Sequence, residues 1–135
     1  MKKIVILLGI LLTSGCVQLY KIPEGQSVAY VESRGMGELQ MCKKGEFYRL
    51  PKNKDGVYKV PVDGRVTLSK FVYIDEYMMS YSCNPAVSFE PVEDEQYIAN
   101  LDFLAGGCII ELVQEEEEKE VGVRLVESTG KPSCD

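Results

Sequence analysis

Residues 97–113 read YIANLDFLAGGCIIELV, and this stretch decides the fold class of the chain. Within it, two apolar runs, 97–103 and 108–113, are separated by a segment with two adjacent glycines. Apolar residues recur at every second position in both runs, which is the spacing at which the side chains of a strand share one face. The stretch therefore predicts two short strands bounded by turn residues.

Further runs with the same period of two are bounded by Gly, Pro, Asn or Asp. They cover residues 28–31, 38–42, 47–50, 57–62, 66–68, 86–90 and 120–127. Pro61 cannot donate a ladder hydrogen bond, so its run is predicted to lie at a sheet edge or to end early. Eight or more short strands joined by turns predict an all-β protein, built as an antiparallel sandwich or barrel.

The stretch 70–83 fits either a helix or a strand. Three tyrosines in it are spaced four residues apart, as on one face of a helix. The odd positions from 71 to 83 are also apolar except Asp75, which favours a strand. We expect a strand here, with Asp75 and Glu76 marking a bulge or turn.

The same stretch carries four large side chains close together, Tyr77, Met78, Met79 and Tyr81. We expect them to pack in the core, because large apolar side chains are usually buried. Exposure of all four together would instead mark a binding surface, since methionine and aromatic side chains adapt well to partners.

Two acidic clusters interrupt the apolar pattern, at residues 93–95 and 115–118. Apolar residues alternate on both sides of the second cluster, so a hairpin with a charged loop is predicted there. Adjacent like charges repel one another and remain solvated. Neither cluster has the alternating oxygen ligands and central glycine of a calcium loop.

The composition excludes several classes of function. The 135 residues include 15 Lys and Arg, 21 Asp and Glu, five Cys and no His or Trp, with 45% apolar residues. A net charge of −6 lacks the basic character of nucleic-acid-binding proteins, so no nucleic acid is expected as a partner. The absence of His excludes metal and catalytic sites that depend on imidazole.

The first fifteen residues have the features of an export signal. Lys2 and Lys3 precede an apolar run at 4–12, and small residues lead to Cys16. Nine residues span about 14 Å as a helix, roughly half of a bilayer core, so the run is too short to remain as a membrane span. We expect residues 1–15 to be removed.

Residues 13–16 read TSGC and resemble the lipobox of bacterial lipoproteins. That resemblance implies a diacylglyceryl thioether on Cys16, cleavage before it, and acylation of the new amino terminus. Several acyl chains hold a protein stably at a bilayer. By resemblance to Gram-negative sorting, Val17 favours the outer membrane, with the protein facing the periplasm.

The mature chain divides into three parts. We expect a lipidated tether at 16–24, one domain at 25–127 and a polar tail at 128–135. Without the signal lysines, 13 basic residues remain against 21 acidic ones, a net charge of −8. An acidic domain is weakly repelled by anionic headgroups, so lipid alone is expected to hold it.

Besides Cys16, the chain contains Cys42, Cys83, Cys108 and Cys134. An even number in an exported domain implies two disulfides, with three possible connectivities. We propose Cys83 with Cys108, which lie near each other in sequence, and Cys42 with Cys134, which would secure the tail. A metal site of four thiolates is the rival interpretation, but the sequence lacks any Cys-x-x-Cys pair.

Residues 83–91 read CNPAVSFEP, and they are followed by YIAN at 97–100 and by a second cysteine that opens the next run. In this arrangement the chain resembles a group of small uncharacterised bacterial lipoproteins. The likeness covers most of residues 25–127. It implies an immunoglobulin-like or transthyretin-like β-sandwich, and it supplies no catalytic residues.

The leading functional hypothesis is a non-enzymatic envelope module that binds a protein or cell-wall partner, with no cofactor or metal. The alternative is an inhibitor or immunity lipoprotein, whose acidic surface attracts a basic lysozyme-like enzyme or toxin. An enzyme is the third class. Ser128 and Lys131 match Ser-x-x-Lys, but the companion motifs of penicillin-recognising enzymes are missing. The Gly-Met-Gly at 35–37 is too short for a phosphate loop.

Overall fold

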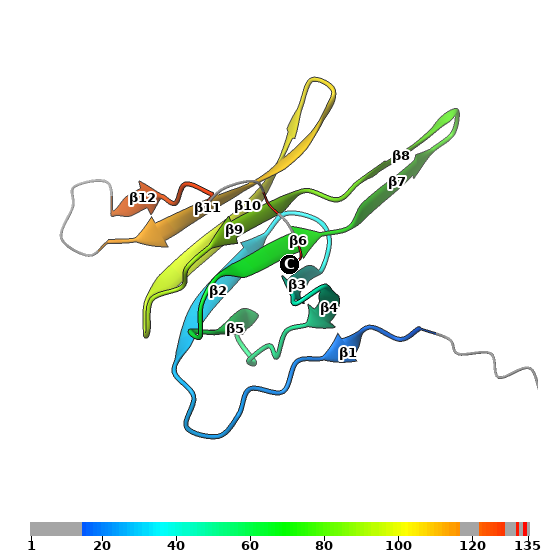
Figure 1. Cartoon of the computed structure of the whole chain (residues 1–135). Coiled ribbons are helices and arrows are strands. Elements are labelled where there is room, and N and C mark those ends of the chain that lie inside the picture. Colours follow the sequence, from blue (N-terminus) through cyan, green and yellow to red (C-terminus); the bar gives the residue numbers. More distant parts are fainter. Residues whose placement is uncertain (1–14, 117–121, 129–131, 133, 135) are drawn as a thin grey trace, which may run out of the picture.

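The computed structural model describes residues 15–116, 122–128, 132 and 134 (Figure 1). The expected signal segment 1–14 lies outside the described residues, as do most of the charged loop after Glu116 and part of the tail. The described part contains twelve strands and no helix. The strands are β1 (Gln18–Leu19), β2 (Val28–Arg34), β3 (Leu39–Lys43), β4 (Glu46–Arg49), β5 (Val57–Pro61), β6 (Val66–Lys70), β7 (Val72–Glu76), β8 (Met79–Cys83), β9 (Ala86–Phe89), β10 (Gln96–Leu104), β11 (Gly107–Glu115) and β12 (Val123–Leu125).

Ten of these strands form two five-stranded sheets that pack face to face, and β7 and β8 form a hairpin of their own. One sheet has the order β1-β4-β3-β6-β9, and the other has the order β12-β11-β10-β2-β5. The predicted all-β sandwich is confirmed. Neighbouring strands are antiparallel except β1 with β4 and β2 with β10, which run parallel. Parallel neighbours need a long connection, so the local turn signals give no hint of them.

Strand alternation produces the core between the sheets. In β3, for example, Leu39 and Met41 are completely buried, whereas Gln40 between them is partly exposed. The same period recurs in β2 and β11, whereas all five residues of β6 are buried. The buried apolar cluster includes Ala29, Val31, Leu39, Met41, Tyr58, Val60, Val66, Leu68, Val87, Phe89, Tyr97, Ala99, Leu101, Ile110 and Leu112.

Two local predictions are confirmed at the sheet margins. β5 is an edge strand and ends at Pro61, which pairs with Val28. β11 and β12 form the hairpin expected around the glutamate run, with Glu115 opposite Val123. The glutamates after residue 116 lie outside the described residues.

The stretch 70–83 is extended, as expected, but its turn lies further along the chain than predicted. β7 ends at Glu76, and the turn consists of Tyr77 and Met78 instead of the expected Asp75 and Glu76. The reason is the register of the sheet. Ser69 pairs with Ala86 in β6 and β9, and the hairpin continues the same register, so the turn falls midway between these partners.

Part of the expected tether is strand. β1 pairs with β4, and the Tyr20 N–H donates to the Arg49 carbonyl oxygen at 2.8 Å. The rings of Tyr20 and Tyr48 meet edge to face, with centroids 5.3 Å apart. These contacts hold residues 18–20 on the sheet. Only Cys16 and Val17 of the expected tether then remain before the sheet begins, and two extended residues span roughly 7 Å.

Candidate functional site

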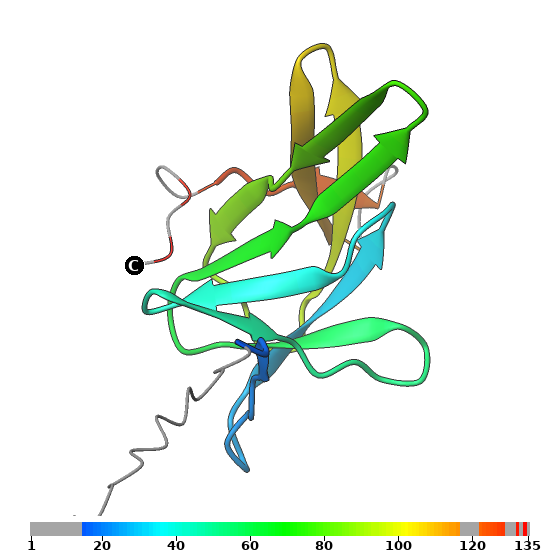
Figure 2. The same ribbon diagram turned by 90° about the vertical axis from the view of Figure 1, so that its right-hand side faces the viewer.

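Both sheets extend beyond the sandwich at the same end. β7 and β8 prolong β6 and β9 of one sheet, and the distal half of β10 and β11 overhangs from the other. The two hairpins project side by side, and both views place β1 lower in the molecule, away from the hairpin tips (Figures 1 and 2). The overhang places large side chains where no facing sheet covers them.

The side chains of β7–β8 become more exposed with distance from the sandwich. Val72, Tyr81 and Met79 lie on one face of this hairpin, since directly paired residues share a face. Their exposed fractions are 3%, 38% and 76% in that order, and Tyr77 and Met78 at the turn are almost completely exposed. The expected core packing of the four large side chains is therefore wrong.

The tip of β10–β11 carries a second exposed apolar group. Phe103 and Leu104 are about half exposed, and Ile109 is exposed on the other strand. The sequence pattern placed Phe103 and Ile109 within strands and Leu104 just after one, and it gave no sign that the three are uncovered. Strand length is the signal that could have shown it, because β10 and β11 have nine residues each while β6 has five.

A disulfide links the base of the β7–β8 hairpin to the tip of the β10–β11 hairpin. Cys83 at the end of β8 is bonded to Cys108 near the start of β11, with Cα atoms 6.3 Å apart. By strand alternation, Cys83 shares a face with Val72, and Cys108 shares a face with Phe103. The bond therefore turns the inner faces of the two hairpins toward each other.

A tight loop at residues 35–37 lies against both hairpin bases. Gly35 has φ of 84°, and a Cβ there would lie 3.1 Å from the Leu101 Cβ on β10. Gly37 has φ of 86°, and a Cβ there would lie 2.9 Å from the Phe71 carbonyl oxygen before β7. Gly35 and Gly37 do not form a phosphate loop. They allow the loop at residues 35–37 to pack closely against both hairpins.

A buried lysine lies beside this loop. Lys70 ends β6 on the core-facing side, following Val66 and Leu68 at alternate positions, and it is completely buried. Burial lowers the pKa of the Lys70 ammonium below its ordinary value. Its Nζ donates a hydrogen bond to the carbonyl oxygen of Arg34, the last residue of β2. The lysine therefore fixes the loop from inside.

We call the exposed apolar side chains of the two projecting ribbons the hairpin surface. Its members are Phe71, Tyr73, Tyr77, Met78, Met79, Tyr81, Phe103, Leu104 and Ile109. Residues 71–83 and 101–111 also contain four carboxylates and no Lys or Arg. The carboxylates are Asp75, Glu76, Asp102 and Glu111. The register places Glu76 on the same face as Tyr81 and Met79, and Asp75 on the opposite face with Tyr73. Each face of the β7–β8 hairpin is therefore both apolar and negatively charged.

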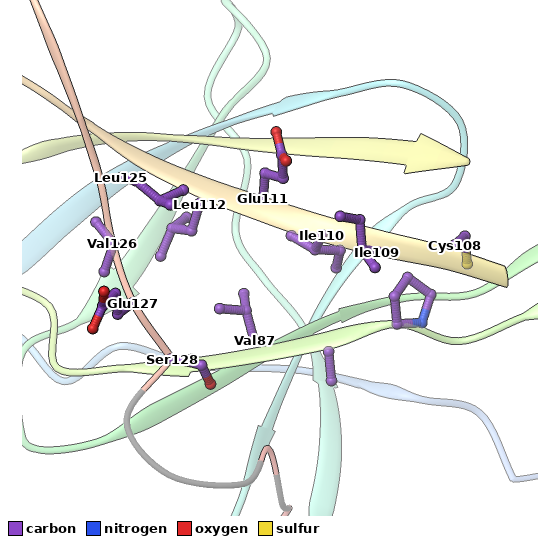
Figure 3. Close-up of a pocket in the computed structure, with 12 residues that line it drawn as sticks. Val87, Cys108, Ile109, Ile110, Glu111, Leu112, Leu125, Val126, Glu127 and Ser128 are labelled. Carbon is purple, nitrogen blue, oxygen red and sulfur yellow. The ribbon is translucent and has the colours of Figure 1, made fainter. Parts of the chain in front are cut away.

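An apolar groove of about 510 Å³ opens on the side of the sandwich between β9 and β11. Figure 3 shows Val87, Ile110 and Leu112 pointing toward the groove, whereas Glu111 points away from it. The segment after β12 runs along one side, where the Ser128 Oγ accepts a hydrogen bond from the Ser88 N–H at 3.2 Å. The groove offers apolar contact but no converging set of charged groups for catalysis.

The remaining predicted residues lie apart from the hairpin surface. Cys42 is bonded to Cys134, with Cα atoms 5.1 Å apart, so both proposed disulfides are present. Cys16 is exposed and carries no disulfide. Ser128 of the Ser-x-x-Lys match lies at the β9 edge, and Lys131 is outside the described residues.

The described residues offer neither a metal-binding cluster nor a membrane-spanning helix. They contain no group of three or more metal-ligating side chains that could hold an ion. They also contain no helix with the length and apolar character needed to cross a bilayer.

The fold and site define a disulfide-bonded β-sandwich with an acidic and apolar pair of projecting hairpins. No protein-family model matches the chain, and no curated protein or solved structure is significantly similar to it. The resemblance to small bacterial lipoproteins thus rests on the motifs quoted above.

Proposed function

We propose that this protein is an envelope lipoprotein that is anchored through acylated Cys16 and binds a protein partner with its hairpin surface, without catalysing a reaction. The observation that carries the proposal is the placement of the two ends. Cys16 lies two residues before β1, which is the edge strand of its sheet, and the hairpin tips lie away from β1 (Figures 1 and 2). An anchored molecule of this shape presents its hairpins away from the bilayer.

The surface around Cys16 suits a membrane contact. Val17, Leu19 and Phe47 are exposed there, on the neighbouring strands β1 and β4 or just before them. Lys21 and Lys44 are exposed in adjoining segments. Apolar side chains near an acyl anchor add buried area, and lysines are attracted to anionic headgroups. By the same resemblance to Gram-negative sorting, we assign the anchor to the periplasmic face of the outer membrane.

Charge is unevenly distributed along the mature chain. Residues 16–65, which include β1, β3 and β4, carry nine basic and six acidic side chains, a net charge of +3. Residues 66–135, which include both hairpins, carry four basic and fifteen acidic side chains, a net charge of −11. This excess of negative charge supports the second candidate function, inhibition of or immunity against a basic lysozyme-like enzyme or toxin, because it attracts a basic partner to the protein.

Two measurements on cells that express the full chain test the proposal. Intact-mass analysis of the membrane fraction is expected to show a chain that starts at Cys16 and carries acyl mass, and Cys16→Ser is expected to abolish both. A photo-cross-linker at Tyr77 is expected to give a discrete protein adduct, whereas one at Asp55, far from the hairpins, is not.

The two measurements can fail separately. A mature chain that begins elsewhere, or that lacks acyl mass, would remove the anchor. Equal adducts from positions 77 and 55, or none from position 77, would remove the hairpin surface as the contact site.

A further inference from the structure

We propose that the partner of the hairpin surface is a basic polypeptide segment whose Arg and Lys side chains lie over the exposed tyrosines and between the surrounding carboxylates. This inference rests on the proposed function and names the chemistry of its partner. It is carried by the combination of an uncovered aromatic surface with an uncompensated negative charge on the same two hairpins.

Within residues 15–116 and 122–128, no basic side chain neutralises this negative charge. In the described part of the chain, Asp75, Glu76, Asp102 and Glu111 form no ion pair. Asp102 accepts a hydrogen bond from the Asn100 amide at 3.0 Å, which leaves its charge in place. The basic residue directly before the first hairpin, Lys70, is buried and bound to a carbonyl oxygen. A positively charged partner would therefore meet no competing cation here.

The turn of β7–β8 has side chains that turn formation does not require. Two-residue hairpin turns favour Asn, Asp and Gly, because these residues adopt positive φ readily. Here the turn residues are Tyr77 and Met78, and both project fully into solvent. With Tyr73 and Tyr81 on the flanking strands, they offer aromatic faces for guanidinium or ammonium groups and thioether contact for apolar neighbours.

Two other occupants fit the charge less well. An anionic bilayer would be repelled by Asp75 and Glu76, which lie next to the turn, and the anchor end lies on the other side of the molecule. A second copy in a two-fold dimer would place the same acidic hairpins against each other. A basic protein segment satisfies both the aromatic and the carboxylate groups.

The test uses the full chain in neutral detergent and a short synthetic peptide of Arg, Leu and Ser. A matched peptide has Glu in place of every Arg. Fluorescence anisotropy is expected to show saturable binding of the Arg peptide and none of the Glu peptide. Binding is expected to weaken by about tenfold or more when salt rises from about 0.05 M to about 0.5 M, because exposed charges are screened.

Two triple variants separate the hairpin charge from the net charge. The hairpin variant is Asp75→Asn, Glu76→Gln and Asp102→Asn. The control variant, Asp55→Asn, Glu90→Gln and Asp94→Asn, removes the same charge from exposed positions outside the hairpins. The hairpin variant is expected to weaken binding at least about fivefold, and the control less than about twofold.

A third variant, Tyr77→Ser with Met78→Ser, keeps the charge and is also expected to weaken binding at least about fivefold. Equal losses in both triple variants would overturn the inference, as would equal binding of the Glu peptide or no binding of the Arg peptide. Tighter association with anionic vesicles, or self-association that the tip variant abolishes, would likewise overturn it in favour of a membrane or a second copy. Acylation of Cys16 does not enter this assay, so the inference and the anchor can fail independently.

Discussion

The buried ammonium of Lys70 donates a hydrogen bond to the carbonyl oxygen of Arg34, 2.5 Å away. β6 ends at Lys70 in one sheet and β2 ends at Arg34 in the other. This contact therefore joins the two sheets at the end of the sandwich from which the hairpins project. The contact depends on the positive charge of Lys70, and burial makes that charge energetically unfavourable.

The first prediction concerns that charge. Burial lowers the pKa of Lys70 below 10.5 in the folded protein. As the pH rises from the folded-state pKa toward 10.5, the folded state releases the proton first, so the unfolded state binds more protons and the free energy of unfolding rises. We expect wild type to gain stability relative to Lys70→Met across this window.

The comparison with Lys70→Met is needed because a second buried group also titrates at high pH. Burial raises the pKa of Tyr97, so the folded state keeps that proton longer than the unfolded state does, and the free energy of unfolding falls as the pH rises. Both proteins contain Tyr97, so its effect cancels in the difference. Urea titrations at a series of pH values measure the difference in the free energy of unfolding between wild type and Lys70→Met. If the difference in the free energy of unfolding did not change with pH, the lowered pKa of Lys70 in the folded protein would be contradicted.

The second prediction concerns the loop between the hairpins. Gly37→Ala meets two obstacles, a positive φ and a carbonyl oxygen 2.9 Å from the new Cβ. Gly25→Ala meets the first obstacle alone, because φ is 78° there and nothing lies within 4 Å. We expect Gly25→Ala to cost about 1–2 kcal/mol from backbone strain, and Gly37→Ala to cost about 1–3 kcal/mol more from the clash. Denaturant unfolding of both variants checks this, and equal costs would exclude the close approach.

The third prediction concerns the disulfide between the two hairpins. Replacing Cys83 and Cys108 by Ala is expected to lower the free energy of unfolding by up to about 3.5 kcal/mol, since 25 residues separate them. Amide exchange in β7 and β8 is expected to accelerate, because the hairpin loses its covalent link to β11. Replacing Cys42 and Cys134 serves as the control. That change is expected to destabilise the protein while leaving exchange in the hairpin relatively unchanged, and the reverse pattern would refute the bracing role.

The fourth prediction separates the exposed tip from the core. Tyr77→Ser with Met78→Ser is expected to change the free energy of unfolding by less than about 0.5 kcal/mol, because both side chains are solvated. Tyr97→Phe is expected to cost about 0.5–1.5 kcal/mol. Tyr97 is buried, and its hydroxyl oxygen accepts a hydrogen bond from the Val92 N–H at 3.1 Å. A large loss of stability in the tip variant would show that these residues pack against the protein.

Local patterns predicted much of the sandwich. The alternation in residues 97–113 corresponds to β10 and β11, and Pro61 lies on an edge strand as its missing donor requires. The parity and spacing of four cysteines led to the two disulfides that the structure contains. These predictions depend on properties that each short segment carries by itself.

The candidate site was harder to predict. Alternation indicates which side chains of a strand share a face, but not whether another layer covers that face. Tyr81 and Met79 follow the same pattern as Val72, yet their exposure differs because the facing sheet ends near the disulfide. The burial of Lys70 was missed for the converse reason, since a lysine at a strand end is ordinarily solvated.

The sequence by itself therefore determined the strand-rich class, the edge position of Pro61 and the number of disulfides, because period, ring geometry and cysteine parity are local or countable properties. The tertiary structure alone decided that two hairpins overhang the sandwich and that the tyrosines of β7 and β8 meet solvent. Coverage of a strand depends on the length and placement of a second sheet, and those are set by pairings between distant parts of the chain.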